Sequence, residues 1–261
     1  MQVTGPDVPC ARRVSSPSWR FVDDTARRAA TEDCMVVSTP ELEIASIVLA
    51  GSFNPGIFHP AWLAANDLIP KIEAEAAENI LVSADYTRFE VDWLGLEVIP
   101  ERLTIMTSQA PYQSPLRDLA QSILTLLPHT PINAMGLNRA THYKLKNEDV
   151  WHSFGHRLAP KDPVWTDILK APGTRRLMIQ GERDDGKRGH VIVTVEPSQR
   201  VDTAIFIDIN DHFARPSDLS GIEGAKWARD ILTEDWRVNT QRINSIRSRL
   251  LIFASEGEGE K

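Results

Sequence analysis

Hydrophobic and polar residues alternate most clearly in the last third of the chain. Two alternating runs lie within residues 175–198, on either side of an Asp-Asp-Gly-Lys sequence at 184–187, and a third run covers residues 203–213. Alternation with a period of two is typical of strands with one buried face, and an Asp-Gly step between two such runs is typical of a hairpin turn. The pattern therefore predicts a three-strand antiparallel meander with a solvated turn.

Strand-like and helical patterns also occur before the meander. Runs typical of strands occupy residues 43–51, 80–108 and 132–145, and the middle run has room for two or three strands. Helical patterns cover residues 60–77, interrupted at Pro70, and residues 148–158. Another helix is predicted between Ser114 and Pro128 by hydrophobic residues at helical spacing, namely Leu116, Leu119, Ile123, Leu126 and Leu127.

The C-terminal segment has the features of a long helix. From Ser220 to Phe253 the sequence contains no proline, and Ser220 and Glu223 have the spacing of a capping box. An uninterrupted helix of about 32 residues would be about 48 Å long. We therefore expect one long helix, part of which extends beyond the domain that carries it.

One side of this predicted helix resembles the seam of a coiled coil, with apolar residues at alternating spacings of four and three. The seam consists of Leu232, Trp236, Asn239, Ile243, Ile246, Leu250 and Phe253. Asn239 is its polar member, and a buried asparagine in such a seam can fix register and partner number. Two interpretations stay open: the seam packs on the sheet of its own domain, or it binds a second copy or another protein.

The order of these elements predicts an α+β fold. Strands follow one another without a helix between each pair, so the alternating pattern of a doubly wound sheet is not met. We expect an antiparallel-rich sheet with a C-terminal three-strand meander, helices on one face and a long C-terminal helix. The expected organisation is a flexible or loosely docked leader at 1–43, an α+β domain at 44–219, the helix at 220–255 and an acidic tail at 256–261.

Composition and charge restrict the classes of partner. The chain of 261 residues has a formal net charge of −7 at pH 7, so a global basic field that attracts nucleic acid is absent. A basic strip on the predicted C-terminal helix leaves a local nucleic-acid surface open, and it consists of Arg237, Arg242, Arg247 and Arg249. Cys10 and Cys34 lie in the leader without the pattern of a disulfide framework. Because no apolar run approaches the roughly 20 residues that span a bilayer, we expect a cytoplasmic protein. We also expect no cofactor.

The stretch from Gly51 to His59 carries a local resemblance to an enzyme family. The sequence Gly-Ser-Phe-Asn-Pro at 51–55 follows a β-branched run and resembles the first turn of the nucleotidyltransferases that adenylate mononucleotides. In that family two histidines after the turn hold phosphates, whereas the corresponding positions here are Ile57 and Pro60, with His59 between them. The resemblance implies a nucleotide-binding turn formed by Gly51, Ser52, Asn54 and His59. The alternative is that these residues end a strand, turn the chain and begin a helix.

A second candidate site combines the last strand of the meander with the helix at 148–158. His152 and His156 are four residues apart, so both rings can face one site. Asp208, Asp211 and His212 lie on the strand or at its end, and carboxylate and imidazole groups of this kind bind divalent metals. The alternative is that the acids satisfy turn backbone groups and the histidines hydrogen-bond locally.

The sequence contains no phosphate-binding loop of the Gly-x-x-x-x-Gly-Lys-Ser/Thr type, no Gly-x-Ser-x-Gly elbow and no Cys-x-x-Cys pair. We therefore expect a non-catalytic binding protein, an accessory subunit of a cytoplasmic assembly that self-associates or binds a protein partner through the C-terminal helix. Two alternative hypotheses remain. One is a metal-dependent hydrolase that uses the His/Asp cluster, and the other is a nucleotide-binding protein that uses the turn at Gly51–His59.

Overall fold

The computed structural model describes residues 39–256. The predictions for the leader, including Cys10 and Cys34, and for most of the acidic tail concern residues outside this range. A single sheet of nine strands dominates the described part of the chain. The strands are β1 (Leu42–Gly51), β2 (Glu78–Val82), β3 (Thr87–Val91), β4 (Leu94–Ile99), β5 (Arg102–Thr107), β6 (Ile132–Lys144), β7 (Leu177–Glu182), β8 (Gly189–Pro197) and β9 (Ala204–Ala214).

All neighbouring strands in the sheet are antiparallel, in the order β2-β3-β4-β5-β1-β6-β9-β8-β7. The predicted α+β class and the C-terminal meander β7-β8-β9 are therefore confirmed. Residues 78–107 form four strands rather than the expected two or three. The reason is that β3, β4 and β5 are joined by two-residue turns at 92–93 and 100–101, which interrupt the hydrophobic pattern very little.

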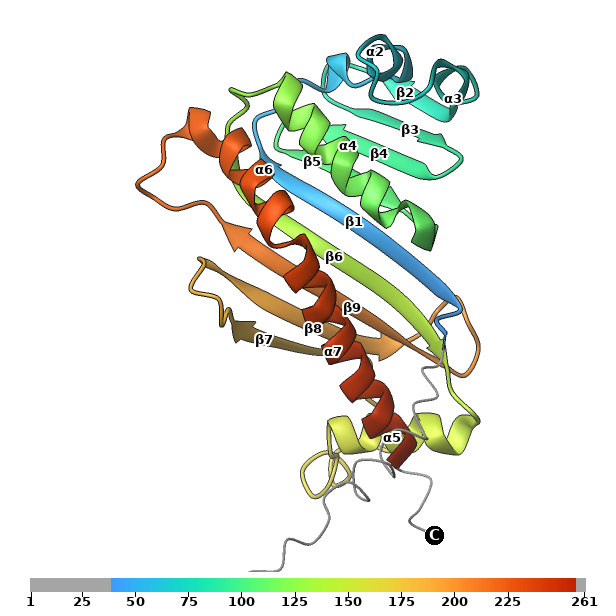
Figure 1. Cartoon of the computed structure of the whole chain (residues 1–261). Helices are drawn as coiled ribbons and strands as arrows, with labels where there is room; N and C mark the ends of the chain where they lie inside the picture. Colours follow the sequence, from blue (N-terminus) through green and yellow to red (C-terminus); the bar gives the residue numbers. More distant parts are fainter. Residues whose placement is uncertain (1–38, 257–261) are drawn as a thin grey trace, which may run out of the picture. The chain divides into compact units, whose positions relative to one another are not determined.

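The longer helices α4, α6 and α7 lie on one face of the sheet (Figure 1). Helix α4 contacts β1 and β5, α6 contacts β6, and α7 contacts β9. None of the helices within residues 39–256 combines the length and apolarity needed to cross a lipid bilayer. The helical elements are η1 (Pro55–Ile57), α2 (Pro60–Ala65), α3 (Lys71–Glu75), η2 (Ala110–Tyr112), α4 (Gln113–Leu126), α5 (Glu148–Leu158), η3 (Gly221–Glu223), α6 (Gly224–Glu234) and α7 (Trp236–Ser255).

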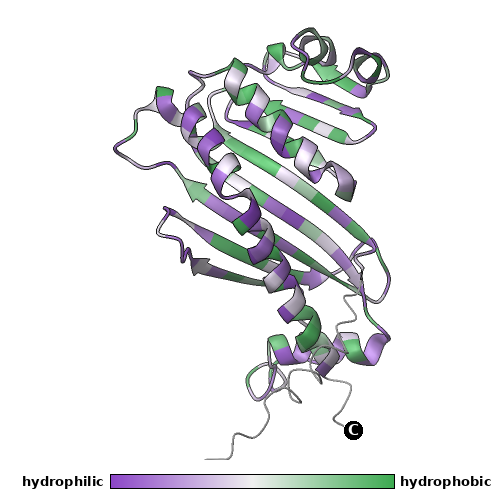
Figure 2. Ribbon diagram, in the orientation of Figure 1, coloured by the Kyte–Doolittle hydropathy of each residue, from purple (hydrophilic) through white to green (hydrophobic). Residues whose placement is uncertain are grey.

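The predicted long C-terminal helix is present as α7, but the helical segment that begins near Ser220 is divided. The capping box of Ser220 and Glu223 opens the short 3-10 turn η3, which leads into α6. Helix α6 ends before Asp235, whose backbone N–H still donates to the Ile231 carbonyl at 2.9 Å. The division at Asp235 is therefore a local change of direction, and both helices carry alternating hydrophilic and hydrophobic bands (Figure 2).

The chain repeats one connectivity in two halves. In the first half, strand β1 is followed by short helices, the meander β2-β3-β4-β5 and helix α4. In the second half, strand β6 is followed by α5, the meander β7-β8-β9 and helices α6 and α7. Strands β1 and β6 pair with each other at the centre of the sheet, with Ile47 opposite Leu137. Each meander therefore extends outward from its own central strand.

The helix-covered face of the sheet holds the hydrophobic core. Alternate residues of β1 point into it, and Ile47 is 0% exposed. One cluster of buried side chains lies among β1, β3, β4, β5, α4 and α6, and a second lies among β8, β9, α5 and α7. The apolar side chains of the strands and those of the helices therefore pack against each other on this one face of the sheet.

Candidate functional site

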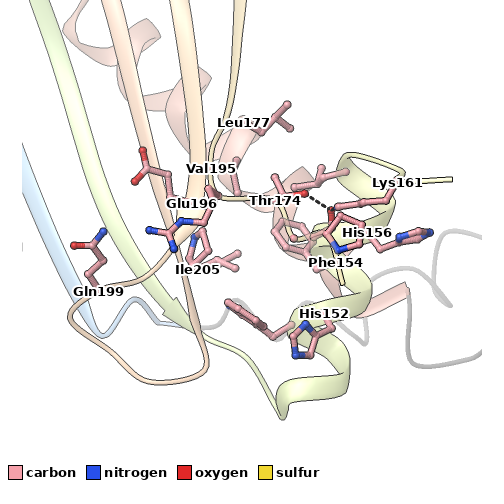
Figure 3. Close-up of a pocket in the computed structure, with 17 residues that line it drawn as sticks. His152, Phe154, His156, Lys161, Thr174, Leu177, Val195, Glu196, Gln199 and Ile205 are labelled. Carbon is pink, nitrogen blue, oxygen red and sulfur yellow. Dashed lines mark hydrogen bonds between the residues drawn. The ribbon is translucent and has the colours of Figure 1, made fainter. Parts of the chain in front are cut away.

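Helix α5 positions the two histidines that the sequence singled out. Its first turn is capped by Asn147, whose side chain accepts a hydrogen bond from the Val150 N–H at 2.9 Å. Phe154 is 2% exposed and packs in the second core cluster, which fixes how the helix is rotated. His152 and His156, on either side of Phe154 in sequence, both line a cavity between α5 and the ends of two strands (Figure 3).

This α5 cavity has a volume of about 530 Å³, within the range of roughly 300–1,000 Å³ that is typical of small-molecule sites. Helix α5, the connection at 159–176 and the adjacent ends of β8 and β9 form its walls. Its apolar lining includes Trp151, Phe154, Leu158, Leu177, Val195 and Ile205. Its polar lining includes His152, His156, Lys161, Thr174, Arg175, Glu196 and Gln199.

Lys161 brings a buried ammonium group to the wall of the α5 cavity. The residue is 8% exposed, and Nζ donates a hydrogen bond to the Gly155 carbonyl at 2.6 Å. The Thr174 hydroxyl donates to the same carbonyl at 3.1 Å, and Figure 3 shows both residues near His156 on the α5 side. Burial lowers the pKa of the Lys161 ammonium. No carboxylate among the described residues is paired with Lys161, so a buried cation faces the cavity without a counter-charge.

The other charged groups of the lining leave this cation unbalanced. The guanidinium of Arg175, also in the lining, adds a second positive charge to the cavity. Glu196 is the acidic residue of the lining, and its Oε1 atom lies 2.9 Å from Nε of Arg176. Because this carboxylate already has a partner, the α5 cavity combines apolar walls with a surplus of positive charge.

The five residues proposed as a metal cluster are not brought together. Asp211 and His212 are neighbours on β9, so their side chains point to opposite faces of the sheet. Asp211 lies on the helix-covered face, Asp208 and His212 lie on the other face, and the two histidines of α5 line the cavity. Within residues 39–256 no group of three or more His, Cys, Asp or Glu side chains is placed to hold a metal ion.

On the face of the sheet opposite the helices, His212 stacks on His190 of the neighbouring strand, with ring centroids 4.6 Å apart. Burial, followed by the charge of His190, lowers the pKa of His212. On the same face, burial and the nearby Glu196 raise the pKa of Asp208. His212 and Asp208 both lie on the face opposite the helices, and Glu196, which acts on Asp208, also belongs to the lining of the α5 cavity.

Asp211 lies at the centre of a buried ionic network, defined by Asp211, Arg183, Arg242, Asp185 and Asn239. Its carboxylate accepts hydrogen bonds from Arg183, from Nη1 of Arg242 at 2.7 Å and from Nδ2 of Asn239 at 2.9 Å. The side chains of Asp211 and Arg183 are 0% and 1% exposed. Arg183 also lies over the ring of Phe213, 3.7 Å from its centroid. This Asp211 network therefore joins β9, the β7–β8 turn and α7.

The β7–β8 turn, which the sequence predicted to be solvated, is fastened to the helices at several points. Asp185 accepts hydrogen bonds from Arg183, from Arg242 at 3.2 Å and from the Lys187 N–H at 3.1 Å. Burial alone would raise the pKa of Asp185, but these hydrogen bonds outweigh it and hold the pKa well below its usual value. Lys187 forms an ion pair with Asp235 between α6 and α7. Only the tip remains in solvent, where the Asp184 side chain is 88% exposed.

The stretch at Gly51–His59 forms a strand end, a turn and a helix start. Asn54 caps η1 by accepting a hydrogen bond from the Gly56 N–H at 3.2 Å. Nδ1 of His59 accepts a hydrogen bond from the Trp62 N–H at 3.1 Å and so caps α2. Leu63 is 0% exposed, and Trp62 is half-buried with its ring 5.5 Å from that of Phe58. The caps give both polar residues a structural role in this turn.

Gly51 is required because two segments of the chain, the end of β1 and the start of β6, approach each other closely. A Cβ atom at this position would lie 2.1 Å from the carbonyl oxygen of Pro131. The register of β1 against β6 also shifts between Ala50 and Gly51. The glycine of the resemblance is therefore explained by packing against the start of β6.

The seam of the C-terminal helix packs on the chain's own sheet. Leu232 and Asn239 are 0% exposed, Ile243 is 1% exposed and Trp236 is 8% exposed. Ile246, Leu250 and Phe253 are partly buried against the second core cluster. Leu232, Trp236, Asn239 and Ile243 are therefore covered within the chain, whereas Ile246, Leu250 and Phe253 keep part of their surface exposed.

The basic strip on α7 is also partly engaged within the chain. Arg242 belongs to the Asp211 network, and Nη1 of Arg247 lies 2.7 Å from Oε1 of Glu43 on β1. Arg237 and Arg249 carry no resolved ion pair among the described residues. The strip therefore does not form one continuous basic surface.

The sequence reasoning missed Lys161 and Thr174, which complete the α5 cavity. The available signal was the length of the connection at 159–176, since loops of more than about 12–15 residues without regular structure are usually functional or disordered. Comparison of the sequence with protein-family models and with curated proteins finds no match. The function is therefore argued from the geometry of the site.

Proposed function

We propose that this protein is a non-catalytic binding protein whose α5 cavity takes a small molecule with an apolar body and one anionic group. The observation that carries this proposal is the buried ammonium group of Lys161, which faces an apolar cavity without a paired carboxylate. A buried charge is costly unless it is paired. An anionic ligand would supply the missing partner while its apolar part covers residues such as Val195 and Ile205.

The composition of the α5 cavity favours binding over catalysis. Thr174 is the hydroxyl-bearing residue of the lining, and it donates its hydrogen bond to the Gly155 carbonyl. A nucleophilic hydroxyl would instead be hydrogen-bonded to a general base. The proposal keeps the binding role expected from the sequence, moves the site from the helix seam to the cavity, and retains the expected cytoplasmic location as part of the hypothesis.

The test uses two fluorescent probes of similar shape and different charge. 8-Anilino-1-naphthalenesulfonate carries a sulfonate, whereas N-phenyl-1-naphthylamine is neutral. The first should bind more tightly, because a hydrogen bond to a charged group contributes about 1.5–3 kcal/mol. Substitution of Lys161→Met should therefore weaken the sulfonate roughly 10- to 150-fold, and should change the affinity of the neutral probe little.

Two further variants complete the experiment. Lys170 is exposed in the same connection, so Lys170→Met is the matched control and should leave both affinities unchanged. Gly173 lines the cavity, and a Cβ there meets no atom within 4 Å, so Gly173→Phe should bring its ring into the cavity and block both probes. Equal losses of both probes in Lys161→Met, or unchanged binding in Gly173→Phe, would contradict the proposal.

A further inference from the structure

The two edges of the sheet differ in how they are protected. An exposed, regular and apolar edge strand is a template for pairing with another strand, and bulges are one device that prevents this. The pairing of edge strand β2 with β3 is shifted between Glu78 and Leu81, and Asn79 within it has a positive φ of 53°. Edge strand β2 is thus irregular, which blunts that edge.

Edge strand β7 has no such irregularity. All six of its residues pair with β8 in unbroken register from Leu177 to Glu182. Its outer side has no neighbour in the sheet. Met178 and Ile179 are 52% and 57% exposed, so two large apolar side chains lie at an edge whose backbone groups are open to a further strand.

Two charged residues at the ends of β7 indicate which strand can pair with it: Arg176, just before β7, and Glu182, its last residue. If β7 pairs antiparallel with β7 of a second copy about an axis at Ile179, Met178 lies opposite Gln180 and Leu177 lies opposite Gly181. In the same register Arg176 lies opposite Glu182 at both ends. Opposite charges directly across an antiparallel pair stabilise it, and the Arg176 side chain is 61% exposed. Glu182 is exposed as well. Nε of Arg176 lies 2.9 Å from Glu196 of the same chain, so Arg176 would lie between Glu196 and the Glu182 of the second copy.

Other registers lose this complementarity. Antiparallel pairing requires residues whose backbone groups point outward on both strands, so registers differ in steps that keep this parity. Moving the axis to Met178 places Glu182 opposite Thr174. Moving it to Gln180 places Arg176 opposite Asp184, in the turn that the Asp211 network holds against α7. The register centred on Ile179 is the one that places Glu182 of β7 opposite Arg176, the residue immediately before β7.

We propose that β7 is a self-association edge, and that two copies of this chain form a dimer by antiparallel pairing of their β7 strands about Ile179. The occupant is a second copy because the strand's charge pattern is complementary to itself. The pairing would continue the sheet from one copy into the other. It does not depend on occupation of the α5 cavity.

The test is the molar mass of the full chain in solution, measured by light scattering after size-exclusion chromatography over a wide range of concentration. The wild type should be a dimer that dissociates on dilution. Arg176→Glu and Glu182→Arg should each yield monomers, because each places like charges opposite one another. The double variant Arg176→Glu/Glu182→Arg should restore the dimer, which shows that the single variants had not failed by misfolding.

A cross-link tests the axis itself. In a Cys10→Ser/Cys34→Ser background, Ile179→Cys should form an intermolecular disulfide, because directly opposite Cβ atoms lie about 4.5–5.5 Å apart. Gln180→Cys lies opposite Met178 and should not cross-link. A matched control on the other edge is Ile80→Lys, which replaces a 54% exposed side chain and should leave the dimer intact. A wild-type monomer at all concentrations, or a dimer that survives both single charge reversals, would overturn the proposal.

Discussion

The two halves of the chain treat the same connection differently. After central strand β1, the turn around η1 closes the end of the first half with aromatic side chains: Phe58 is 0% exposed, and its ring centroid lies 6.2 Å from that of Phe53. After central strand β6, helix α5 and the connection at 159–176 leave a cavity of about 530 Å³. The same topological position is filled in one half and open in the other.

The sequences of the two connections explain this difference. In the first half, Oγ1 of Thr87 donates to the Pro55 carbonyl at 2.8 Å, and Nε1 of Trp93 donates to Glu73 at 2.9 Å, so the short helices are tied to the meander. In the second half, Gly155 and Gly173 line the cavity and have no atom within 4 Å of a built Cβ. The second half also has aromatic side chains here, Trp151 and Phe154, but its two glycines and Lys161 leave space between them. Because the first half has the same order of elements without such a cavity, the fold itself does not require a cavity at this position.

The largest predicted effect removes the aromatic filling of the first half. Phe58→Ala should lower the free energy of unfolding by about 3–5 kcal/mol, since a fully buried phenylalanine leaves a void. Phe154→Ala in the second half should cost less, because one side of that ring already faces the α5 cavity. Urea denaturation of both variants measures the difference. Equal losses would show that the two connections are packed alike.

The second prediction concerns the Asp211 network, which covers the second half of the sheet with charge where the first half uses apolar contacts. Asp211→Asn should lower the free energy of unfolding by about 3 kcal/mol or more, because it removes the buried carboxylate that pairs with both Arg183 and Arg242 and leaves Asp185 as the remaining carboxylate partner of Arg183. Asp184→Asn changes a carboxylate whose side chain is 88% exposed, and it serves as the control with little effect. Urea denaturation measures both variants. If Asp211→Asn lowers the free energy of unfolding by less than about 1 kcal/mol, the Asp211 network does not contribute to stability as proposed.

A third prediction compares a glycine from each half. Gly155→Ala should raise the free energy of unfolding by about 0.5–1 kcal/mol, since alanine is the better helix former and the position is open. Gly51→Ala should destabilise the protein, because its Cβ would lie 2.1 Å from the Pro131 carbonyl oxygen. Thermal unfolding by circular dichroism compares the two. A stabilising Gly51→Ala would contradict the close approach of the strands.

The smallest predicted effect is a pH dependence on the sheet face opposite the helices. The pKa of His212 is lowered from 6.5 in the folded protein, chiefly by burial. Below pH 6.5 the unfolded chain therefore binds more protons at this residue, so the stability that neutral His212 contributes is lost as the pH falls through its folded pKa. His212→Gln should flatten the decline in unfolding free energy between pH 7 and pH 5. An unchanged slope would show that His212 does not contribute to it.

The sequence predicts the local elements well because their causes are local. The alternation at 203–213 is the alternation of β9, and Leu116, Leu119 and Ile123 lie on the buried side of α4. Leu126, from the same predicted pattern, is 42% exposed, and Leu127 lies just past the end of the helix. His152 and His156 were recognised as sharing one side of a helix, and both line the α5 cavity. Because side chains alternate along β9, Asp208 and His212 share one face of the sheet and Asp211 lies on the other.

The parts that the sequence did not reveal depend on contacts between distant segments. Arg183 in the β7–β8 turn and Asp211 on β9 form a buried ion pair, and neither residue has a local signal for it. Lys161 became a cavity residue only through its hydrogen bond to Gly155 and the folding of its connection against the ends of β8 and β9. The repeated connectivity was hidden because the halves share an order of elements and have different residues.

Hydrogen–deuterium exchange of the full chain, with and without saturating 8-anilino-1-naphthalenesulfonate, tests whether the α5 cavity is the binding site. If the open connection of the second half is the binding site, the probe should slow exchange in α5, in residues 159–176 and at the adjoining ends of β8 and β9. Exchange in α2, α3 and β1 to β5 should remain unchanged. Protection that appears in the first half, or that leaves α5 and residues 159–176 unaffected, would contradict the account.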